Sequence, residues 1–482
     1  MKKPTFERTE VGASPGRYRY SSDVVPGIAL LIDVAMIAFA AMGCYLAIMV
    51  RITPELSYYT FCTVFIALCY LALGHRAGFY TINTIMRPLS RADDIMIANI
   101  TGFFLFYSVI VSLDDIDHYY IPWIFYFFGA STAALIMARV VLFMALRMLS
   151  ERAVLGRSMV VLGTGAQAAR FIARLGDAKP YFSSMIGVFG VDPDHLPSTF
   201  EGQPVLGGLN DLLSCARRQR IDDVVVALPW NADRNVIAAI ERLKELPVNV
   251  YLSSDLVGYE LAFRPVAAQF SALPVFEVVQ KPISGWSYAL KTIEDYVLTV
   301  IILVLLSPIL LLIALAIKLD TPGPVFFMQQ RLGFNNKAFA IYKFRSMYHS
   351  ETPETVVRQA TKGDPRVTRV GRLIRATSLD ELPQLLNVLD GSMSLVGPRP
   401  HAISHNEEYG AQIRGYFARH RVKPGITGWA QVNGLRGETE ALELMEARVR
   451  HDVYYAENWS LFLDLKILVM TAMVVFFQKS AY

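Results

Sequence analysis

Residues 293–317 read Ile293-Glu-Asp-Tyr-Val-Leu-Thr-Val-Ile-Ile-Leu-Val-Leu-Leu-Ser-Pro-Ile-Leu-Leu-Leu-Ile-Ala-Leu-Ala-Ile317, an apolar run with Ser307-Pro308 in its interior. About 20 apolar residues cross a bilayer, so a crossing helix is the default structure for such a run. A proline inside a helix removes a backbone hydrogen bond and bends the helix, and a neighbouring serine can satisfy the freed carbonyl. The run therefore has two candidate topologies, a crossing helix or a broken helix that re-enters the same face.

The charges that follow this run favour the re-entrant topology. Cytoplasmic segments carry an excess of lysine and arginine. Four basic residues come soon after the run: Arg331, Lys337, Lys343 and Arg345. A re-entrant helix keeps both of its ends in the cytoplasm, whereas a crossing helix would place everything downstream outside the cell.

Four other apolar stretches lie upstream, at roughly 24–50, 57–79, 95–113 and 121–146. Each is near the ~20 residues that a spanning helix needs, so residues 1–150 are predicted to form a bundle of four transmembrane helices. Asp33 lies within the first stretch, where its charge is tolerated if it faces the bundle or lies near a helix end. Basic residues flank the stretches so that the N-terminus and everything after residue 150 are predicted to be cytoplasmic.

The composition indicates an integral membrane protein. Of the 482 residues, 53% are hydrophobic and 18% are charged, and the formal net charge of +4 is too small to suggest a nucleic-acid partner. The four cysteines have no C-x-x-C or Cys/His spacing, so neither a disulfide framework nor a zinc site is indicated. About twenty polar residues precede the first apolar stretch, which is therefore expected to be retained and not cleaved as a signal peptide.

Residues 151–262 are predicted to form a Rossmann-like cytoplasmic domain. A strand ends at Gly163-Thr-Gly165, a helix with Ala168 follows to give G-x-G-x-x-A, and further strands and helices alternate after it. Asp192 is roughly placed to close the second strand, where a dinucleotide site has an acidic residue. The domain either binds a nucleotide or keeps the turn only for close packing of helix on strand.

Residues 263–482 contain two adjacent carboxylates in the stretch Arg375-Ala-Thr-Ser-Leu-Asp-Glu-Leu-Pro-Gln384. Asp380 and Glu381 lie at the predicted start of an apolar helix, where Ser378 and Glu381 fit a capping box and Asp380 fits an N-cap. A helix N-terminus also favours an ionised carboxylate and attracts phosphate. Capping and phosphate chemistry both remain open for this pair taken alone.

Basic residues around the pair favour phosphate chemistry. Four arginines precede it: Arg366, Arg369, Arg372 and Arg375. Arg399 is fixed between Pro398 and Pro400, and the strand predicted over 340–347 puts Lys343 and Arg345 on one face. Rigidly held guanidinium groups bind phosphate in two-point contacts, so this surrounding suits an anionic substrate better than it suits capping.

Four motifs of this region resemble those of the large monotopic polyprenyl-phosphate glycosyl-1-phosphate transferases of bacterial exopolysaccharide synthesis. They are Lys343-Phe-Arg-Ser-Met347, Ser378-Leu-Asp-Glu-Leu-Pro-Gln384, Leu395-Val-Gly-Pro-Arg-Pro400 and Lys423-Pro-Gly-Ile-Thr-Gly-Trp429. The resemblance covers roughly residues 285–482, and the four spans and the degenerate Rossmann-like domain are similar to the long members. Residues 434–466 look most like the undecaprenyl-phosphate glucose phosphotransferase branch.

The resemblance implies a two-step enzyme. Asp380 would attack the β-phosphorus of UDP-glucose, release UMP and form an aspartyl-phosphoglucose intermediate, which undecaprenyl phosphate would then attack; covalent catalysis splits one hard step into two. Glu381 would position or deprotonate the lipid phosphate or assist the metal. Magnesium would be bound at Asp380, in line with the preference of Mg²⁺ for carboxylate and phosphate oxygens. The substrate-binding candidates are Lys343, Arg345, Arg375, Arg399 and Pro400.

A protein of this kind would lie in the bacterial inner membrane with its catalytic domain on the cytoplasmic face. It would perform the first membrane step of exopolysaccharide or capsule synthesis, and a homo-oligomer is compatible with the sequence. The last apolar run, 459–477, is predicted to be an amphipathic interfacial helix with Asp464 and Lys466 on one polar edge, and a sixth span is the alternative.

Other functions remain open at this stage. The same chemistry could use UDP-galactose or an N-acetylated UDP-sugar. The chain could instead be a membrane regulatory subunit whose Rossmann-like domain senses a nucleotide, or an inactive scaffold of a polysaccharide assembly complex. The regulatory function would leave Asp380, Glu381 and the arginines after residue 330 without a role.

Overall fold

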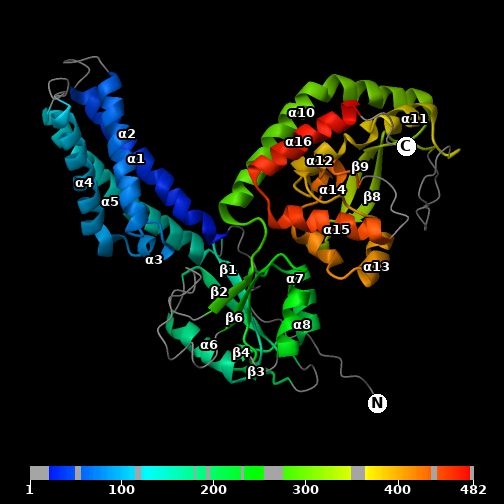
Figure 1. The fold of residues 1–482 in the computed structure, drawn as a ribbon, viewed down its shortest axis with the longest axis horizontal. Helices are drawn as coiled ribbons and strands as arrows, with labels where there is room; N and C mark the ends of the chain where they lie inside the picture. The colour runs from blue at the N-terminus through cyan, green and yellow to red at the C-terminus, as the bar shows by residue number, and fades with distance from the viewer. Residues whose placement is uncertain are drawn as a thin grey trace. The chain divides into compact units, whose positions relative to one another are not determined.

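The computed structural model describes residues 21–48, 56–113, 121–152, 154–178, 181–191, 196–229, 233–253, 275–348, 364–435 and 442–477 (Figure 1). Contacts between Cα atoms group the chain into two compact units. The first comprises Met1–Met159, Ala169–Ile186 and Leu256–Phe276, and the second comprises Val160–Ala168, Gly187–Asp255 and Glu277–Tyr482. The division into three domains at residues 150 and 262 stays a prediction.

The four upstream apolar stretches form long helices. They are α1 (Val25–Ile48), α2 (Leu56–Arg76), α4 (Ala92–Ser112) and α5 (Ile121–Glu151), with the short α3 (Ile82–Ile85) and η3 (Pro88–Arg91) between α2 and α4. Each long helix contributes to one apolar core, for example through Ile37, Ile66, Phe106 and Phe127. The structure contains five helices, in its described parts, that are long and apolar enough to cross a membrane, and these four account for all but one of them.

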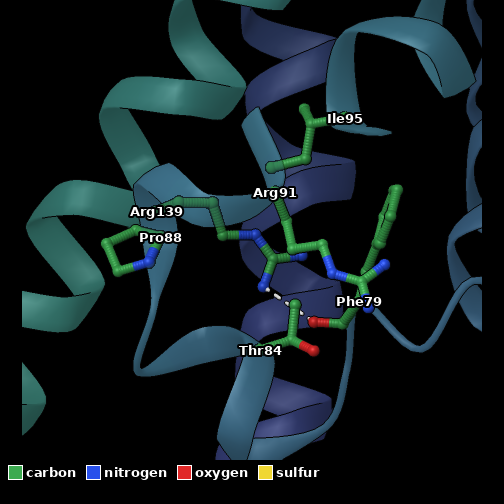
Figure 2. Close-up of a pocket in the computed structure, with 6 residues that line it drawn as sticks. All are labelled: Phe79, Thr84, Pro88, Arg91, Ile95 and Arg139. Carbon is green, nitrogen blue, oxygen red and sulfur yellow. Dashed lines mark hydrogen bonds between the residues drawn. The ribbon is translucent and has the colours of Figure 1, made fainter. Parts of the chain in front are cut away.

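Asp33 lies inside this group of helices, as its charge requires. It is fully buried, and its carboxylate is 2.6 Å from Arg139 Nη2 on α5 and accepts a 3.1 Å hydrogen bond from the Tyr80 hydroxyl. Arg139 also donates to the carbonyl of Phe79 at 3.4 Å and lines a small pocket there (Figure 2). An intramembrane carboxylate is tolerated when a cation neutralises it, which explains why Asp33 can occupy an apolar helix.

The α/β part contains a five-stranded sheet in the order β2-β1-β5-β6-β7. Its strands are β1 (Arg157–Leu162), β2 (Ser183–Phe189), β5 (Asp223–Val226), β6 (Asn249–Ser253) and β7 (Val275–Val279), and β5 and β6 pair in parallel. Three helices connect strands: α6 (Ala166–Ala178), α7 (Leu209–Arg218) and α8 (Asp233–Leu243). A short hairpin of β3 (Thr199–Phe200) and β4 (Gln203–Pro204) precedes α7. This arrangement agrees with the predicted alternation of strands and helices.

The glycine turn after β1 has a packing reason. Gly163 has φ of +136°, and a Cβ there would lie 2.4 Å from the carbonyl oxygen of Ala227, which follows β5. Only glycine permits so close an approach of two backbones. The motif therefore has a structural explanation without a bound nucleotide, and Asp192, roughly placed for the acidic residue of a dinucleotide site, lies outside the described residues.

The apolar run at 293–317 belongs to α10 (Gly285–Asp320), a helix of 36 residues with Pro308 in its interior. A straight helix of this length would be ~54 Å long. The ribbon of α10 bends along its length (Figure 1). Its outer face remains apolar and exposed, with Leu305, Leu311 and Leu319 each more than 70% accessible.

Both halves of α10 pack on the same α/β fold. Leu298 and Ile302 of the first half join a core that includes Ile341, whereas Ile313 and Ile317 of the second half join a core that includes Phe344. Ile341 and Phe344 belong to one strand, β9 (Ala338–Phe344). A single strand thus contributes to the cores that hold the two ends of the helix.

The remaining elements build the rest of this fold. β8 (Phe326–Leu332) pairs antiparallel with β9, and β10 (Ser394–Val396) pairs parallel with β11 (Gly425–Thr427). The helices and 3₁₀ turns are η6 (Phe334–Asn336), α11 (Arg369–Ala376), η7 (Leu379–Glu381), α12 (Gln384–Leu389), α13 (Ile403–Gln412), η8 (Tyr416–Arg421), α14 (Trp429–Val432), α15 (Leu442–Glu457) and α16 (Leu461–Phe477).

The polar residue of α16 differs from its predicted position. Asp464 does not lie on an exposed polar edge: it is fully buried, its carboxylate is 2.7 Å from Lys291 Nζ of α10, and it accepts hydrogen bonds from Tyr455 and Trp459. The helix pattern of α16 placed Asp464 away from the apolar face, but a buried lysine on another element supplies the partner that permits burial. Lys466 lies 5.3 Å from the ring of Trp429.

Candidate active site

The two adjacent carboxylates do not cap a helix. Asp380 and Glu381 lie in the 3₁₀ turn η7, and α12 begins only at Gln384. Ser378 precedes the turn in the left-handed conformation, with φ of +57°, and its side chain forms no capping hydrogen bond there. The predicted capping box is therefore absent, and both carboxylates are available for other interactions.

Glu381 is held by two cations. Its Oε1 accepts from Lys343 Nζ at 2.7 Å and from Arg399 Nη2 at 2.5 Å, and its Oε2 accepts from Arg399 Nη1 at 3.0 Å. Burial opposes ionisation of this carboxyl, but Arg399 and Lys343 outweigh it and lower the pKa of Glu381 well below its usual value. Glu381 is therefore an anion over a wide pH range and a poor proton acceptor.

Asp380 has the opposite surroundings. Within the described residues, its carboxylate makes no hydrogen bond or ion pair. Burial and then the neighbouring Glu381 raise the pKa of Asp380, while Lys343, Arg375 and Arg399 act in the other direction. Asp380 was expected at the start of an α-helix, but it lies in the 3₁₀ turn η7, and the start of α12 follows only at Gln384. Asp380 is therefore a half-buried carboxylate whose ionised form is disfavoured by burial and by Glu381.

The other candidate residues divide into two groups. Lys343, Arg375 and Arg399 surround the acid pair closely enough to affect the pKa of Asp380, and Pro400 follows Arg399 directly. Arg345 lies just beyond β9, where its guanidinium donates to the carbonyls of Pro322 and Thr321 at 2.5 and 2.7 Å. Arg345 thus satisfies carbonyls at the C-terminal end of α10, and the structure does not bring it to the acid pair.

Asn387 connects the acid-pair segment to the strand that carries Lys343. Its side-chain oxygen accepts from Tyr342 N at 2.9 Å, and its nitrogen donates to the carbonyl of Ala340 at 2.8 Å. Asn387 is buried on α12, six residues after Glu381. One amide side chain therefore fixes α12 against β9 and holds Lys343 within reach of Glu381.

Glycines explain how the Arg399 loop reaches this position. A Cβ on Gly397 would lie 2.4 Å from the carbonyl oxygen of Lys423, and a Cβ on Gly428 would lie 2.2 Å from that of Gly397. Two backbone segments therefore cross in direct contact, and Pro398 O accepts from Gly425 N at 3.0 Å. Gly428 is needed here for packing, and the neighbouring Trp429 packs in the same core as β10.

Two features of the site were not predicted from the sequence. Arg331 on β8 is near Arg399 and Glu381, and burial together with Arg399 lowers its pKa to about 10. Arg419 contacts the Arg399 loop from behind, as described below. In the sequence, Arg331 is one of the basic residues after the 293–317 run that indicate topology, and the Arg-His-Arg run at 419–421 is the one sign of a buried cationic group.

The donor set fits magnesium only with help from a substrate. Among the residues that the structure describes, no group of three or more His, Cys, Asp or Glu is arranged to hold a metal ion. Mg²⁺ is usually bound by one or two carboxylates together with substrate phosphates and water. Asp380 has a carboxylate without a competing partner, whereas both Glu381 oxygens are occupied by cations. Asp380 is therefore the residue that fits a magnesium ligand.

The arrangement places the cationic side chains of Lys343 and Arg399 on Glu381, next to the carboxylate of Asp380. The sequence profile described as bacterial sugar transferase matches residues 286–478, which include the whole site, and a profile described as CoA-binding domain matches residues 75–254. A UDP-glucose:undecaprenyl-phosphate glucose-1-phosphate transferase of Xanthomonas campestris pv. campestris is 39% identical over 363 residues, covering 75% of each chain. The chain belongs to the bacterial sugar transferase family, in the branch of the polyprenyl-phosphate glycosyl-1-phosphate transferases.

Two further relatives carry the same description. The protein of Klebsiella pneumoniae is 43% identical over 295 residues, or 61% of this chain and 63% of its own length. The protein of Escherichia coli (strain K12) is 46% identical over 276 residues, or 57% of this chain and 59% of its own length. The chain thus matches somewhat less than two thirds of these two relatives.

Proposed function

We propose that the protein transfers a sugar 1-phosphate from a UDP-sugar to undecaprenyl phosphate and releases UMP. Glucose 1-phosphate is the sugar phosphate that we favour. The observation that carries this proposal is that Asp380, whose carboxylate has no hydrogen-bond or ion-pair partner among the described residues, lies next to Glu381, which contacts Lys343 and Arg399. The relatives whose names include UDP-glucose and undecaprenyl phosphate support the choice of both substrates.

Asp380 acts as the nucleophile in two displacements at one phosphorus. A carboxylate oxygen attacks the β-phosphorus of UDP-glucose, the bond from that phosphorus to the bridging oxygen breaks, and UMP leaves with the bridging oxygen. An oxygen of undecaprenyl phosphate then attacks the phosphorus, breaks its bond to Asp380 and restores the carboxylate. The poor solvation of Asp380 favours this role because a desolvated anion reacts more readily than a hydrated one.

Glu381 organises the cations and does not accept a proton. The low pKa of Glu381 makes it a weak base. Its carboxylate therefore holds Lys343 and Arg399 in place until the substrate phosphates bind these two cations as well. The side chains of Lys343 and Arg399 are 22% and 31% exposed, which leaves them accessible to an anion. Arg375 supplies further positive charge near Asp380.

Magnesium is proposed to bind at Asp380 together with the diphosphate oxygens. When bound, it would supply positive charge next to the phosphate that leaves with UMP. The unpartnered carboxylate of Asp380 supports this assignment. The remaining steps belong to the protein: Asp380 forms and breaks the bond to phosphorus, and Lys343 and Arg399 hold the substrate phosphates.

The catalytic part is proposed to lie on the cytoplasmic face of the bacterial inner membrane, with α10 re-entrant and α1, α2, α4 and α5 as a transmembrane bundle. Both halves of α10 pack into cores that share β9, which favours a helix that returns to its own side. Its exposed leucines supply an apolar surface for the bilayer. The lipid phosphate would then meet Asp380 at the headgroup level.

The topology can be tested with a single cysteine in place of Ser350, between the run at 293–317 and the last apolar run, in a chain whose four cysteines are replaced by serine. A membrane-impermeant maleimide applied to intact spheroplasts should leave this cysteine unlabelled and should label it after lysis. Labelling of intact spheroplasts would contradict the re-entrant helix. A cysteine in the segment between the first and second apolar stretches serves as the positive control.

The reaction is tested by UMP release from UDP-glucose by the purified full-length chain with Mg²⁺, with and without undecaprenyl phosphate. We expect lipid-dependent turnover, a single-turnover burst without lipid, and a loss of at least ~10³-fold in Asp380→Asn. Asp390→Asn, an exposed carboxylate at the end of α12, is the control and should keep wild-type rates.

Two results of this experiment would change the proposal. Turnover only with UDP-galactose or an N-acetylated UDP-sugar would keep the chemistry and replace the substrate. Absence of UMP release from every UDP-sugar would refute the enzyme, and nucleotide binding by the full chain at its Rossmann-like part would then favour a regulatory subunit.

A further inference from the structure

A buried ion pair lies behind the loop that carries Arg399. Arg419 of η8 and Asp452 of α15 have side chains that are 0% and 2% exposed, and Arg419 Nη2 is 2.7 Å from Asp452 Oδ2. Neither residue touches the acid pair. A buried charge pair of this kind is costly to desolvate, so it calls for an explanation beyond stability.

Arg419 holds the Arg399 loop at two points. Its Nη2 donates to the carbonyl oxygen of Arg399 at 2.7 Å, and its Nη1 is 2.5 Å from His401 Nδ1 and 3.0 Å from His401 Nε2. A guanidinium can only donate, so the imidazole must be neutral to accept. Burial and the nearby Arg419 lower the pKa of His401 well below its usual value, which keeps the ring in the accepting form.

The loop has little other freedom. Arg399 lies between Pro398 and Pro400, and a residue that precedes proline is restricted to extended backbone conformations. Pro398 O is already fixed by Gly425 N. The next peptide group along the chain joins Arg399 to Pro400, and its carbonyl oxygen accepts a hydrogen bond from Arg419. Fixing this plane fixes the direction in which the Arg399 side chain leaves the loop.

Asp452 supports the hydrogen bond from Arg419 to the Arg399 carbonyl. Three arginines lie near one another here: burial lowers the pKa of Arg448, and the positive charges of Arg419 and Arg399 lower it further. Asp452 is the carboxylate placed among them, and it is buried completely. Without this negative charge, Arg419 would be repelled from Arg399 instead of donating to its backbone.

We infer that Asp452 is a positioning residue for sugar-phosphate transfer: through Arg419 it fixes the backbone of Arg399, and thereby the guanidinium that clamps Glu381 and meets the substrate phosphates. This inference rests on the proposed function. The geometry of the reacting groups is set by a helix, α15, that contributes no group to the site itself. Misplacement of a catalytic group by about 1 Å can cost ~10²-fold in rate, so a remote carboxylate can have a large effect.

A double-mutant cycle separates positioning from general stability. Asp452→Asn should lower kcat for UMP release by about 30-fold in the wild-type background and by less than about twofold in the Arg399→Ala background, because its effect passes through Arg399. Equal factors in the two backgrounds, or an unchanged kcat in Asp452→Asn, would overturn the inference. Should Asp452→Asn fail to fold, Arg419→Lys replaces it in the same cycle, because lysine keeps the charge but lacks the planar guanidinium that contacts Asp452, the Arg399 carbonyl and His401 together.

A matched control comes from the same two elements. Arg421 of η8 is 3.7 Å from Glu457 of α15 and donates to the carbonyl of Gln280, not to the Arg399 loop. Glu457→Gln should therefore leave kcat within about twofold of wild type. A loss in Glu457→Gln as large as that in Asp452→Asn would show that any disturbance between η8 and α15 has this effect, and would refute the specific role of Asp452.

A second readout does not depend on turnover. Amide hydrogen exchange in the segment 394–403 should be at least about tenfold faster in Asp452→Asn than in wild type or in Glu457→Gln, because the hydrogen bond from Arg419 to the Arg399 carbonyl is weakened. Unchanged exchange there would overturn the positioning role even in a protein with normal folding. Wild-type chain that releases no UMP would refute the proposed function, whereas this exchange result would still decide whether Asp452 fixes the loop.

Discussion

Two of the clusters that pair a carboxylate with an arginine, Asp33 with Arg139 and Glu381 with Arg399, differ in what surrounds them. Among the apolar helices, Asp33 and Arg139 are 0% and 4% exposed, and tyrosine hydroxyls donate to the same carboxylate. In the acid-pair site, Glu381 is 14% exposed while its cations Lys343 and Arg399 are 22% and 31% exposed. The first cluster is sealed, and the second is open on its cationic side.

The difference separates a structural ion pair from one that can exchange partners. In a sealed pair the attraction between the charges offsets part of their desolvation, and neither charge is left accessible to a ligand. The open pair leaves positive charge accessible and has a second carboxylate, Asp380, next to it without a partner among the described residues. An incoming phosphate can share these cations with Glu381, which is the behaviour expected of a binding site.

The largest expected contrast comes from the same conservative change in both clusters. Arg399→Lys should reduce kcat/KM for UMP release by about 100-fold, because lysine cannot make the two-point contact with a carboxylate or phosphate. Arg139→Lys should leave the turnover of folded protein within about twofold of wild type. Steady-state assays of both variants, corrected for folded fraction, make the comparison, and equal losses would erase the distinction between the clusters.

A smaller effect is expected from pH. Asp380 must be ionised to attack, and its pKa is raised above the usual 3.8, so the rate should fall tenfold per pH unit below a midpoint higher than 3.8. Glu381 cannot cause this fall, because its pKa is lowered. The burst of UMP without lipid isolates the step from titration of the lipid phosphate.

Glu381→Gln sharpens the same measurement. The substitution removes the negative charge of Glu381, which raises the pKa of Asp380, and it leaves the positive charges of Lys343 and Arg399, which lower it. The acidic limb of the pH profile, where the rate falls with decreasing pH, should therefore move to lower pH. A limb that stays in place or moves upward would show that Asp380 is not the titrating group. Arg345→Lys should leave the midpoint unchanged, because Arg345 donates to the carbonyl of Thr321 and does not contact Asp380 or Glu381.

The smallest effect on turnover belongs to the sealed cluster. Asp33→Asn leaves Arg139 buried without a counter-ion, which should lower the free energy of unfolding by about 3 kcal/mol but keep UMP release by folded protein within about twofold. Thermal unfolding of the detergent-solubilised chain gives the stability. The double variant Asp33→Asn, Arg139→Gln should recover part of the loss, and a single variant that loses turnover while folded would connect this cluster to catalysis.

The sequence predicted what depends on local pattern. The apolar stretches became α1, α2, α4, α5 and α10, and the tolerance of Asp33 inside the first of them was explained by its burial against Arg139. Hydrophobic length is sufficient for such predictions because it does not depend on distant partners. The motifs around Lys343, Glu381 and Arg399 also pointed to residues that the fold brings into contact.

The features that the sequence could not predict depend on contacts between distant segments. Strand alternation put Arg345 on the face of Lys343, but the strand ends at Phe344 and the guanidinium turns to carbonyls after α10. Asp464 was expected on a polar edge because its partner, Lys291, belongs to another helix. Arg419, Asp452 and His401 had no motif spacing, since a buried network is defined by three-dimensional packing.

Asn387 has one more consequence, which concerns the register of β9. Its amide pairs with the backbone of Ala340 and Tyr342 as a neighbouring strand would, so it fixes where β9 lies along α12. Side chains alternate between the two faces of a strand, and a slip of one residue would therefore turn Lys343 away from Glu381 and present Tyr342 or Phe344 in its place. A chain that kept every charged group of the site but shifted β9 by one position would leave Glu381 paired with Arg399 alone.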